Sequence, residues 1–133
     1  MTWMLDTSVA IPLRESDSGT LERVAELSDN LMISAVTRVE LENGVYRDPT
    51  LSGHRRALLD IMLDSLHVLP FDDDCAAEFG RIVAALGWSR ATTIDRMIAA
   101  TAIVSEATLI TLNGKDFKNI PGLKLVVWET PIL

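Results

Sequence analysis

The sequence predicts an α/β protein, a three-layer sandwich with a mostly parallel central sheet flanked by helices. Short apolar runs that suit buried strands alternate with longer segments whose apolar residues recur at helical spacing. Parallel neighbours in a sheet need crossover connections, which helices supply. The chain has 133 residues, a length that suits one domain with one core. We therefore expect a single domain over residues 1–133.

The first part of the chain contains two predicted strands. Residues 3–5 form a short apolar run, and the segment Asp6-Thr7-Ser8 that follows suits a turn and a helix cap. Apolar residues recur at helical spacing over residues 21–27, and residues 31–33 give the second strand. The next helix is expected to begin near Thr37 and to end before an Asp-Pro pair.

The rest of the chain continues this alternation. In chain order we expect a helix over 52–66, a strand over 68–71, helices over 75–86 and 94–103, and strands over 108–112 and 123–128. Three aspartates precede the helix of 75–86, where the helix dipole favours negative charge, and Gly87 ends it.

Charge and composition limit the classes of function. The net charge is −7, and no basic stripe in the sequence indicates nucleic-acid binding. If acidic residues held divalent cations, however, the metal ions would supply positive charge that attracts phosphate at that site. No apolar stretch is long enough to span a bilayer, and the N-terminus lacks the pattern of a secretory signal. The lone Cys75 suits a buried position in a reducing compartment. We expect a cytoplasmic protein without a membrane partner.

Four acidic residues are predicted to meet at one edge of the sheet. Asp6 closes the first strand, and Glu40 is expected in the first turn of the helix after the second strand. Asp95 opens the helix that precedes the strand of 108–112, and Asn113 and Asp116 follow that strand. Ligands of open α/β sheets bind beyond the carboxyl ends of the strands. These acids therefore form the candidate catalytic site.

The chemistry of such a cluster points to divalent cations. Carboxylates that lie close together cannot all stay ionised unless cations intervene. Oxygen ligands without histidine or cysteine suit Mg²⁺ or Mn²⁺. Two such ions can activate water and stabilise the leaving oxygen of a phosphodiester. The sequence also offers no obvious nucleophile with a base beside it.

Each acid has a purely structural alternative. Thr37 and Glu40 have the spacing of an S/T-x-x-E capping box, and Thr92 and Asp95 fit its looser form. Asp6 could cap a helix, and Asp116 could belong to a turn. The shared placement of the four acids favours a functional site over these separate explanations.

In order and spacing, these motifs resemble the PIN domain, and specifically the VapC toxins of bacterial toxin–antitoxin operons. The resemblance covers nearly the whole chain, and its signals are residues 4–8, residues 33–41 with Asn43-Gly44, Asp95 with residues 98–102, and residues 111–117. It implies a PIN-like fold and a Mg²⁺- or Mn²⁺-dependent endoribonuclease. Its catalytic and metal-binding acids would be Asp6, Glu40, Asp95 and Asp116.

The resemblance also implies supporting residues and partners. Thr7 or Ser8 and Asn113 would assist the metal shell, with either Asn113 or Asp116 as the direct ligand. A cognate antitoxin would wrap the toxin and block its site, and a homodimer would form a heterotetramer or larger assembly with it. The nearby Arg90, Arg96 and Lys115 are candidate contacts to RNA, although Arg90 and Arg96 could equally pair with the acids.

Two rival functions remain at this point. A phosphoacceptor receiver domain is also a small doubly wound protein, and Asp6, Asp72, Thr111 and Lys115 could be assigned to its roles. Receivers usually carry two adjacent acids after the first strand, whereas Thr7 follows Asp6 here. A catalytically inactive PIN domain that only binds a partner is disfavoured by the complete set of acids.

Overall fold

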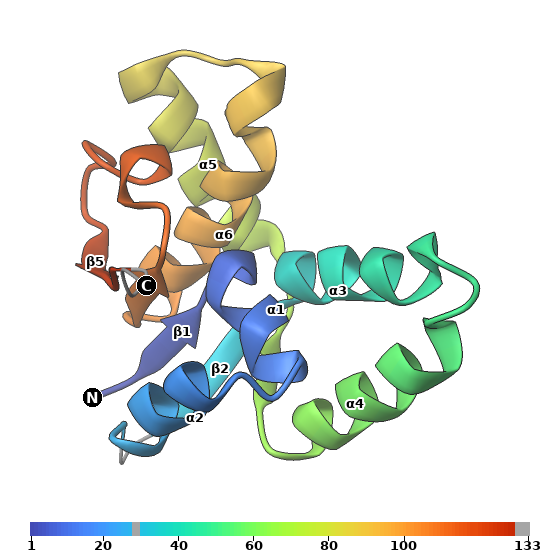
Figure 1. The fold of residues 1–133 in the computed structure, drawn as a ribbon. Helices are drawn as coiled ribbons and strands as arrows, with labels where there is room; N and C mark the ends of the chain where they lie inside the picture. Colours follow the sequence, from blue (N-terminus) through green and yellow to red (C-terminus); the bar gives the residue numbers. More distant parts are fainter. Residues whose placement is uncertain (28–29, 130–133) are drawn as a thin grey trace.

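The fold is known from a computed structural model, which describes residues 1–27 and 30–129 (Figure 1). In this part of the chain five parallel strands form one sheet in the order β3-β2-β1-β4-β5. The strands are β1 (Trp3–Leu5), β2 (Leu31–Ser34), β3 (His67–Leu69), β4 (Thr108–Thr111) and β5 (Lys124–Val127). The predicted α/β class is confirmed, and the described sheet is parallel throughout.

Helices connect the first four strands, and a shorter turn precedes the fifth. The helices are α1 (Thr7–Arg14), α2 (Ser18–Ala25), α3 (Ala35–Arg47), α4 (Ser52–Asp64), α5 (Asp73–Leu86) and α6 (Thr93–Val104), with 3₁₀ turns η1 (Arg90–Thr92) and η2 (Gly114–Asp116). Among the described residues, no helix is both long and apolar enough to cross a membrane.

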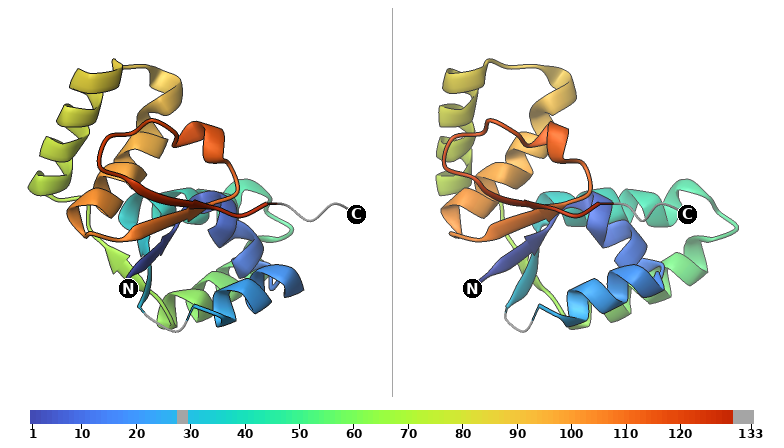
Figure 2. Two further views of the ribbon diagram at one scale, coloured as in Figure 1. Left: turned by 90° about the vertical axis from the view of Figure 1, so that its left-hand side faces the viewer. Right: turned by 60° about the vertical axis from the view of Figure 1, so that its left-hand side comes forward.

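The sheet separates two hydrophobic cores. Side chains alternate between the faces of a strand, so Met4 packs into one core and Leu5 into the other. The first core includes buried residues of α5 and α6, and the second includes buried residues of α1, α3 and α4. Figure 2 shows α5 and α6 on the opposite side of the sheet from α1 to α4. The three-layer sandwich is therefore confirmed.

The chain reverses its direction across the sheet at β1. From β1 it proceeds outward to β2 and β3, and it then returns through α5 and α6 to place β4 on the other side of β1. The carboxyl ends of β1 and β4 are neighbours, since Leu5 is paired with Ile110. Such a switch point is where open α/β sheets bind ligands.

Helix α3 corrects one boundary of the prediction. It begins at Ala35 rather than near Thr37, because Ser34 at the end of β2 caps it and accepts a hydrogen bond from the Thr37 backbone N–H at 2.9 Å. Glu40 consequently lies in the second turn of α3 and not in the first. The predicted third strand also shifts, from 68–71 to His67–Leu69.

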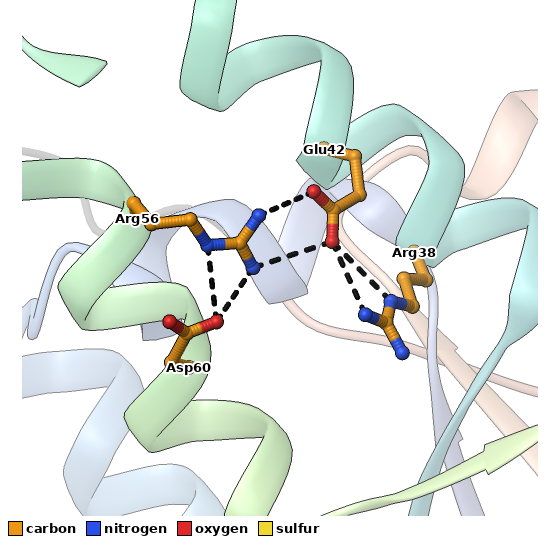
Figure 3. Close-up of polar contacts among 4 residues, drawn as sticks. All are labelled: Arg38, Glu42, Arg56 and Asp60. Carbon is orange, nitrogen blue, oxygen red and sulfur yellow. Dashed lines mark hydrogen bonds and ion pairs between the residues drawn. The ribbon is translucent and has the colours of Figure 1, made fainter. Parts of the chain in front are cut away.

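Helices α3 and α4 are joined by a network of charged side chains (Figure 3). Arg56 of α4 donates to both carboxylate oxygens of Glu42 on α3 and also to Asp60 on its own helix. Arg38 donates to Glu42 from one turn earlier in α3. The hydrogen bonds from Arg56 are the main reason that the pKa of Glu42 is lowered.

We expect the Arg56→Ala variant to lose about 1 kcal/mol of stability, because it removes contacts to two carboxylates and the packing of a long side chain. Urea unfolding would measure this loss. Arg81→Ala is the matched control, since Arg81 is 69% exposed and pairs only with Glu78 within one helix. Equal unfolding midpoints for the two variants would contradict a stabilising role of the network.

Candidate active site

Asp6 lies at the switch point of the sheet, with 3% of its surface exposed. Its Oδ1 accepts hydrogen bonds from the Ser8 hydroxyl at 2.6 Å and from the Val9 backbone N–H at 3.2 Å. Its Oδ2 accepts from the Thr111 hydroxyl at 2.5 Å. Thr111 ends β4, so this hydrogen bond joins the two strands at their carboxyl ends. The carboxylate is therefore held from both sides of the switch point.

Burial and hydrogen bonding act in opposite directions on Asp6. Burial disfavours the charged form and is the largest effect, so the pKa of Asp6 is raised above its ordinary value. The donors Ser8, Thr111 and Val9 oppose this shift by stabilising the carboxylate. An acid held in this way gains much from a nearby cation, because a positive charge would compensate for the lost solvation.

Glu40 is connected to α1 by a layer of hydroxyl groups. The Thr7 hydroxyl donates to Glu40 Oε1 at 2.5 Å. It also lies 3.3 Å from the Thr37 hydroxyl oxygen, which in turn lies 3.3 Å from that of Ser34. Ser34 and Thr37 are fully buried. The layer thus fixes Glu40 against the helix that Asp6 begins.

Asp95 interacts electrostatically with the three other acids. Its pKa is raised to about 6, first by burial and then by the negative charges of Asp116, Glu40 and Asp6. Asp95 lies in the first turn of α6, and Asp116 is an exposed residue of η2. Four acids from four separate elements therefore share one region, as their positions after strands and at helix starts predict.

Of the three acids that could have been helix caps, Asp6, Glu40 and Asp95, only Asp6 caps a helix. Asp6 is the N-cap of α1, and its carboxylate accepts from the Val9 N–H. Glu40 lies beyond the first turn of a helix that Ser34 caps, and the Thr92 N-cap of α6 makes no side-chain capping hydrogen bond. The capping box is therefore wrong as an explanation for Glu40 and Asp95.

The remaining predicted residues surround this region in different ways. Ser8 contacts Asp6 directly, and its hydroxyl also accepts from the Leu112 N–H. Asn113 is exposed, and its backbone N–H donates to the Thr111 hydroxyl at 2.9 Å. Arg96 and Lys115 line a cavity beside Asp95 and Asp116, whereas Arg90 is exposed in η1 and is not part of the cavity lining.

Three buried hydroxyl residues were missing from the predicted site. Ser34, Thr37 and Thr111 have their hydroxyl groups next to the acids or to their partners. The signal was present, because Ser34 and Thr111 end two strands of the sheet at the edge where Asp6 lies. Polar residues that end an apolar strand must find hydrogen-bond partners inside the protein.

The donor set fits a hard divalent cation held partly through water. All candidate ligands are oxygen atoms, as Mg²⁺ and Mn²⁺ prefer. In the described residues, no three acidic, histidine or cysteine side chains lie close enough to hold an ion together. Mg²⁺ commonly binds through one or two carboxylates and several waters. Asp6 and Asp95, whose charged forms are both disfavoured by burial, are the best candidates for direct ligands.

Fold and site together define an α/β protein with an acidic site at the switch point of a parallel sheet. The sequence profile of the PIN domain matches residues 3–123. The chain belongs to the PIN domain family, and within it to the VapC ribonucleases.

Two VapC proteins resemble the chain over nearly its whole length. Ribonuclease VapC2 of Rickettsia felis is 32% identical, with 97% of this chain and 99% of that protein aligned. The tRNA(fMet)-specific endonuclease VapC of Salmonella typhimurium is 29% identical, with 96% of this chain and 98% of that protein aligned.

Solved structures agree with this relationship. VapBC2 from Rickettsia felis, bound to a DNA fragment from its promoter, contains a chain with a TM-score of 0.87 and 28% identity, over 97% of this chain and 100% of that one. DNA-bound VapBC from Salmonella typhimurium gives a TM-score of 0.83 at 28% identity, over 96% and 98% of the two chains. Membership of the family removes the receiver domain from consideration.

Turn η2 depends on the glycine at its start. A Cβ added at Gly114 would lie 2.7 Å from Cγ2 and 3.1 Å from Cγ1 of Val127 on β5. Valine is β-branched and cannot easily turn away. Gly114 therefore lets the segment with Lys115 and Asp116 pack directly against the edge strand.

Replacement of Asp95 by asparagine should stabilise the metal-free protein at pH 7.5. The folded-state pKa of Asp95, about 6, lies above its ordinary value of 3.8. The folded protein therefore holds the Asp95 proton more tightly than the unfolded chain does. The stability that this provides is fully present below pH 3.8 and is lost as the pH rises through 6. After a discount for solvent screening, the gain should be on the order of 1–2 kcal/mol.

Thermal or urea unfolding in the presence of a chelator would measure this gain at several pH values. It should shrink towards zero at pH 4, where the wild-type side chain is already protonated. A variant that is no more stable than wild type at pH 7.5 would contradict the conclusion that burial and the neighbouring acids destabilise the charged form of Asp95.

The Gly114→Ala variant should lose about 1–3 kcal/mol of stability through overpacking and cleave RNA more slowly, because η2 must move away from β5. The double variant Gly114→Ala with Val127→Ala should recover part of both losses, since it removes the methyl groups that clash. Urea unfolding and an RNA cleavage assay would test this. Absence of any recovery would show that the contact with Val127 is unimportant.

Proposed function

We propose that the chain is the toxin of a type II toxin–antitoxin module and hydrolyses phosphodiester bonds of RNA. PIN domain ribonucleases generally depend on divalent metal ions. In this chain Asp6, Glu40, Asp95 and Asp116 would hold Mg²⁺, with Mn²⁺ as a substitute. The observation that carries the proposal is the match to the PIN domain over residues 3–123, with Asp6 at the switch point of the sheet and Asp95 and Asp116 lining one cavity.

Each side chain of the site has a distinct task in this proposal. Asp6 is fixed by Ser8 and Thr111, so its carboxylate would bind a cation without rearrangement. Thr7 orients Glu40 by its hydrogen bond. Asp116 lies on an exposed turn and would complete the site from the solvent side, with Asn113 beside it. When bound, the divalent cations would activate a water and stabilise the leaving oxygen.

Contacts to RNA would come from cations close to the acids. Arg96 and Lys115 line the cavity next to Asp95 and Asp116, which supports their assignment to this role. Arg90 lies nearby in chain order, on the exposed turn before α6, and would reach the substrate only at its periphery.

A cognate antitoxin is the proposed protein partner, because the similar solved structures are toxin–antitoxin complexes. An apolar groove of about 410 Å³ between α1, α2 and α4 would suit part of such a partner, and Ile61 on its rim is 67% exposed. We further propose a homodimer, a heterotetramer or larger assembly with the antitoxin, and a location in the cytoplasm.

The decisive test is the cleavage of total cellular RNA by the purified protein with Mg²⁺ or Mn²⁺ supplied. Cleavage should stop when a chelator is added. Asp6→Asn should reduce the rate by more than about 100-fold, because it removes a ligand rather than a supporting hydrogen bond. Asp116→Asn should also reduce it, and this exposed position carries little risk for folding.

Asp73→Asn is the matched control, since Asp73 is an exposed aspartate in the first turn of α5 and does not line the cavity that contains Asp95 and Asp116. It should cleave RNA like wild type. Activity that persists in chelator, or that survives Asp6→Asn in a folded protein, would refute the metal-dependent mechanism. No cleavage by wild type would favour the inactive PIN domain.

A further inference from the structure

A polar cavity of about 370 Å³ lies directly beside the acidic site. Its polar lining combines two of the acids with three cationic residues, an amide and a hydroxyl, which are Asp95, Asp116, Arg96, Lys115, Lys118, Asn119 and Thr92. Its volume is within the range of about 300–1,000 Å³ that is usual for small-ligand sites. The cavity is therefore large enough for part of a nucleotide.

The cavity lining contains most of the lysines of the chain. The sequence contains three lysines, Lys115, Lys118 and Lys124, and two of them line this one cavity. The chain as a whole carries a net charge of −7. Three cationic side chains in one cavity lining, next to a carboxylate site, indicate a ligand that is itself an anion.

The backbone that carries the two lysines is fixed by the core. Phe117 lies between them in sequence and is 2% exposed, and Ile120 follows at 7%. Both side chains pack into the core that includes α5 and α6. The ammonium groups of Lys115 and Lys118 therefore project from an anchored segment, while their own residues are exposed.

The third cation of the cavity, Arg96, belongs to α6. The Arg96 guanidinium donates to the carbonyl oxygen of Gly87, at the end of α5, at 2.5 Å. This hydrogen bond leaves other donors of the guanidinium for a ligand. The cavity thus has positive charge on α6 and on the segment after β4, and Asp95 and Asp116 belong to the same lining.

We propose that this cavity binds the phosphate that neighbours the scissile one in single-stranded RNA, with Lys118 and Lys115 as its main contacts. The proposal rests on the ribonuclease function proposed above. Lysine is a compact point charge that suits phosphate oxygens without a fixed geometry. Contacts of this kind set the position of the strand but do not read its sequence. Lys118 is thereby a positioning residue for cleavage.

Lysine footprinting tests the proposal without any need for turnover. The Asp6→Asn variant is treated with an acetylating reagent, with and without a short single-stranded RNA in Mg²⁺, and the labelled peptides are quantified by mass spectrometry. RNA should protect Lys115 and Lys118 several-fold and leave Lys124 unprotected. Equal labelling of all three lysines with and without RNA would overturn the proposal.

Kinetics of the Lys118→Ala variant give a second, independent readout. Its KM for RNA should rise several-fold with little change in kcat, and the slope of log affinity against log salt should fall by about 0.7–1, as for one lost phosphate contact. Lys124→Ala is the matched control and should behave as wild type. A purely structural role of Lys118 would not change the salt dependence.

The two proposals fail in different ways. If wild type cleaves RNA in a metal-dependent manner but the lysines are unprotected and Lys118→Ala has a normal KM, only the phosphate site is wrong. If wild type neither binds nor cleaves RNA, the ribonuclease function and the phosphate site are both wrong.

Discussion

The hydrogen bond between Asp6 and Thr111 is the contact on which the rest of the site depends. It joins the residue that follows β1 to the last residue of β4, at the place where the chain reverses its course across the sheet. The parallel register that pairs Leu5 with Ile110 brings the two residues together. Because Asp6 is buried, its carboxylate is tolerated only with donors around it. The helices then bring the other acids towards a group that is already fixed.

Much of this arrangement follows from sequence patterns alone. The order of strands and helices and the convergence of Asp6, Glu40, Asp95 and Asp116 follow from apolar periodicity and from the rule that ligands bind at carboxyl ends of strands. The start of α3 was wrong by two residues, since Thr37 looked like a cap while Ser34 performs that role. A serine or threonine at the end of a strand can serve either as the last strand residue or as a cap, and only the folded chain decides.

The cavity with Lys118 was beyond sequence reasoning for a different reason. Lys115 and Lys118 both lie close to Asp116 in the sequence, but a buried phenylalanine separates them, and the sequence alone does not show that both line one cavity. The path of the segment after β4 depends on packing of Phe117 and on the close contact of Gly114 with Val127. Such tertiary contacts leave no periodic signal.

The position of β1 in the middle of the sheet has a consequence for the synthesis of the protein. Its two neighbours are β2 and β4, so Asp6 has no Thr111 beside it until most of the chain has been translated. A polypeptide that ends before β4 contains Asp6, Glu40 and Asp95, but it lacks Thr111 and Asp116. The proposed nuclease would therefore have its complete acidic site only after β4 and the turn that follows it have been synthesised.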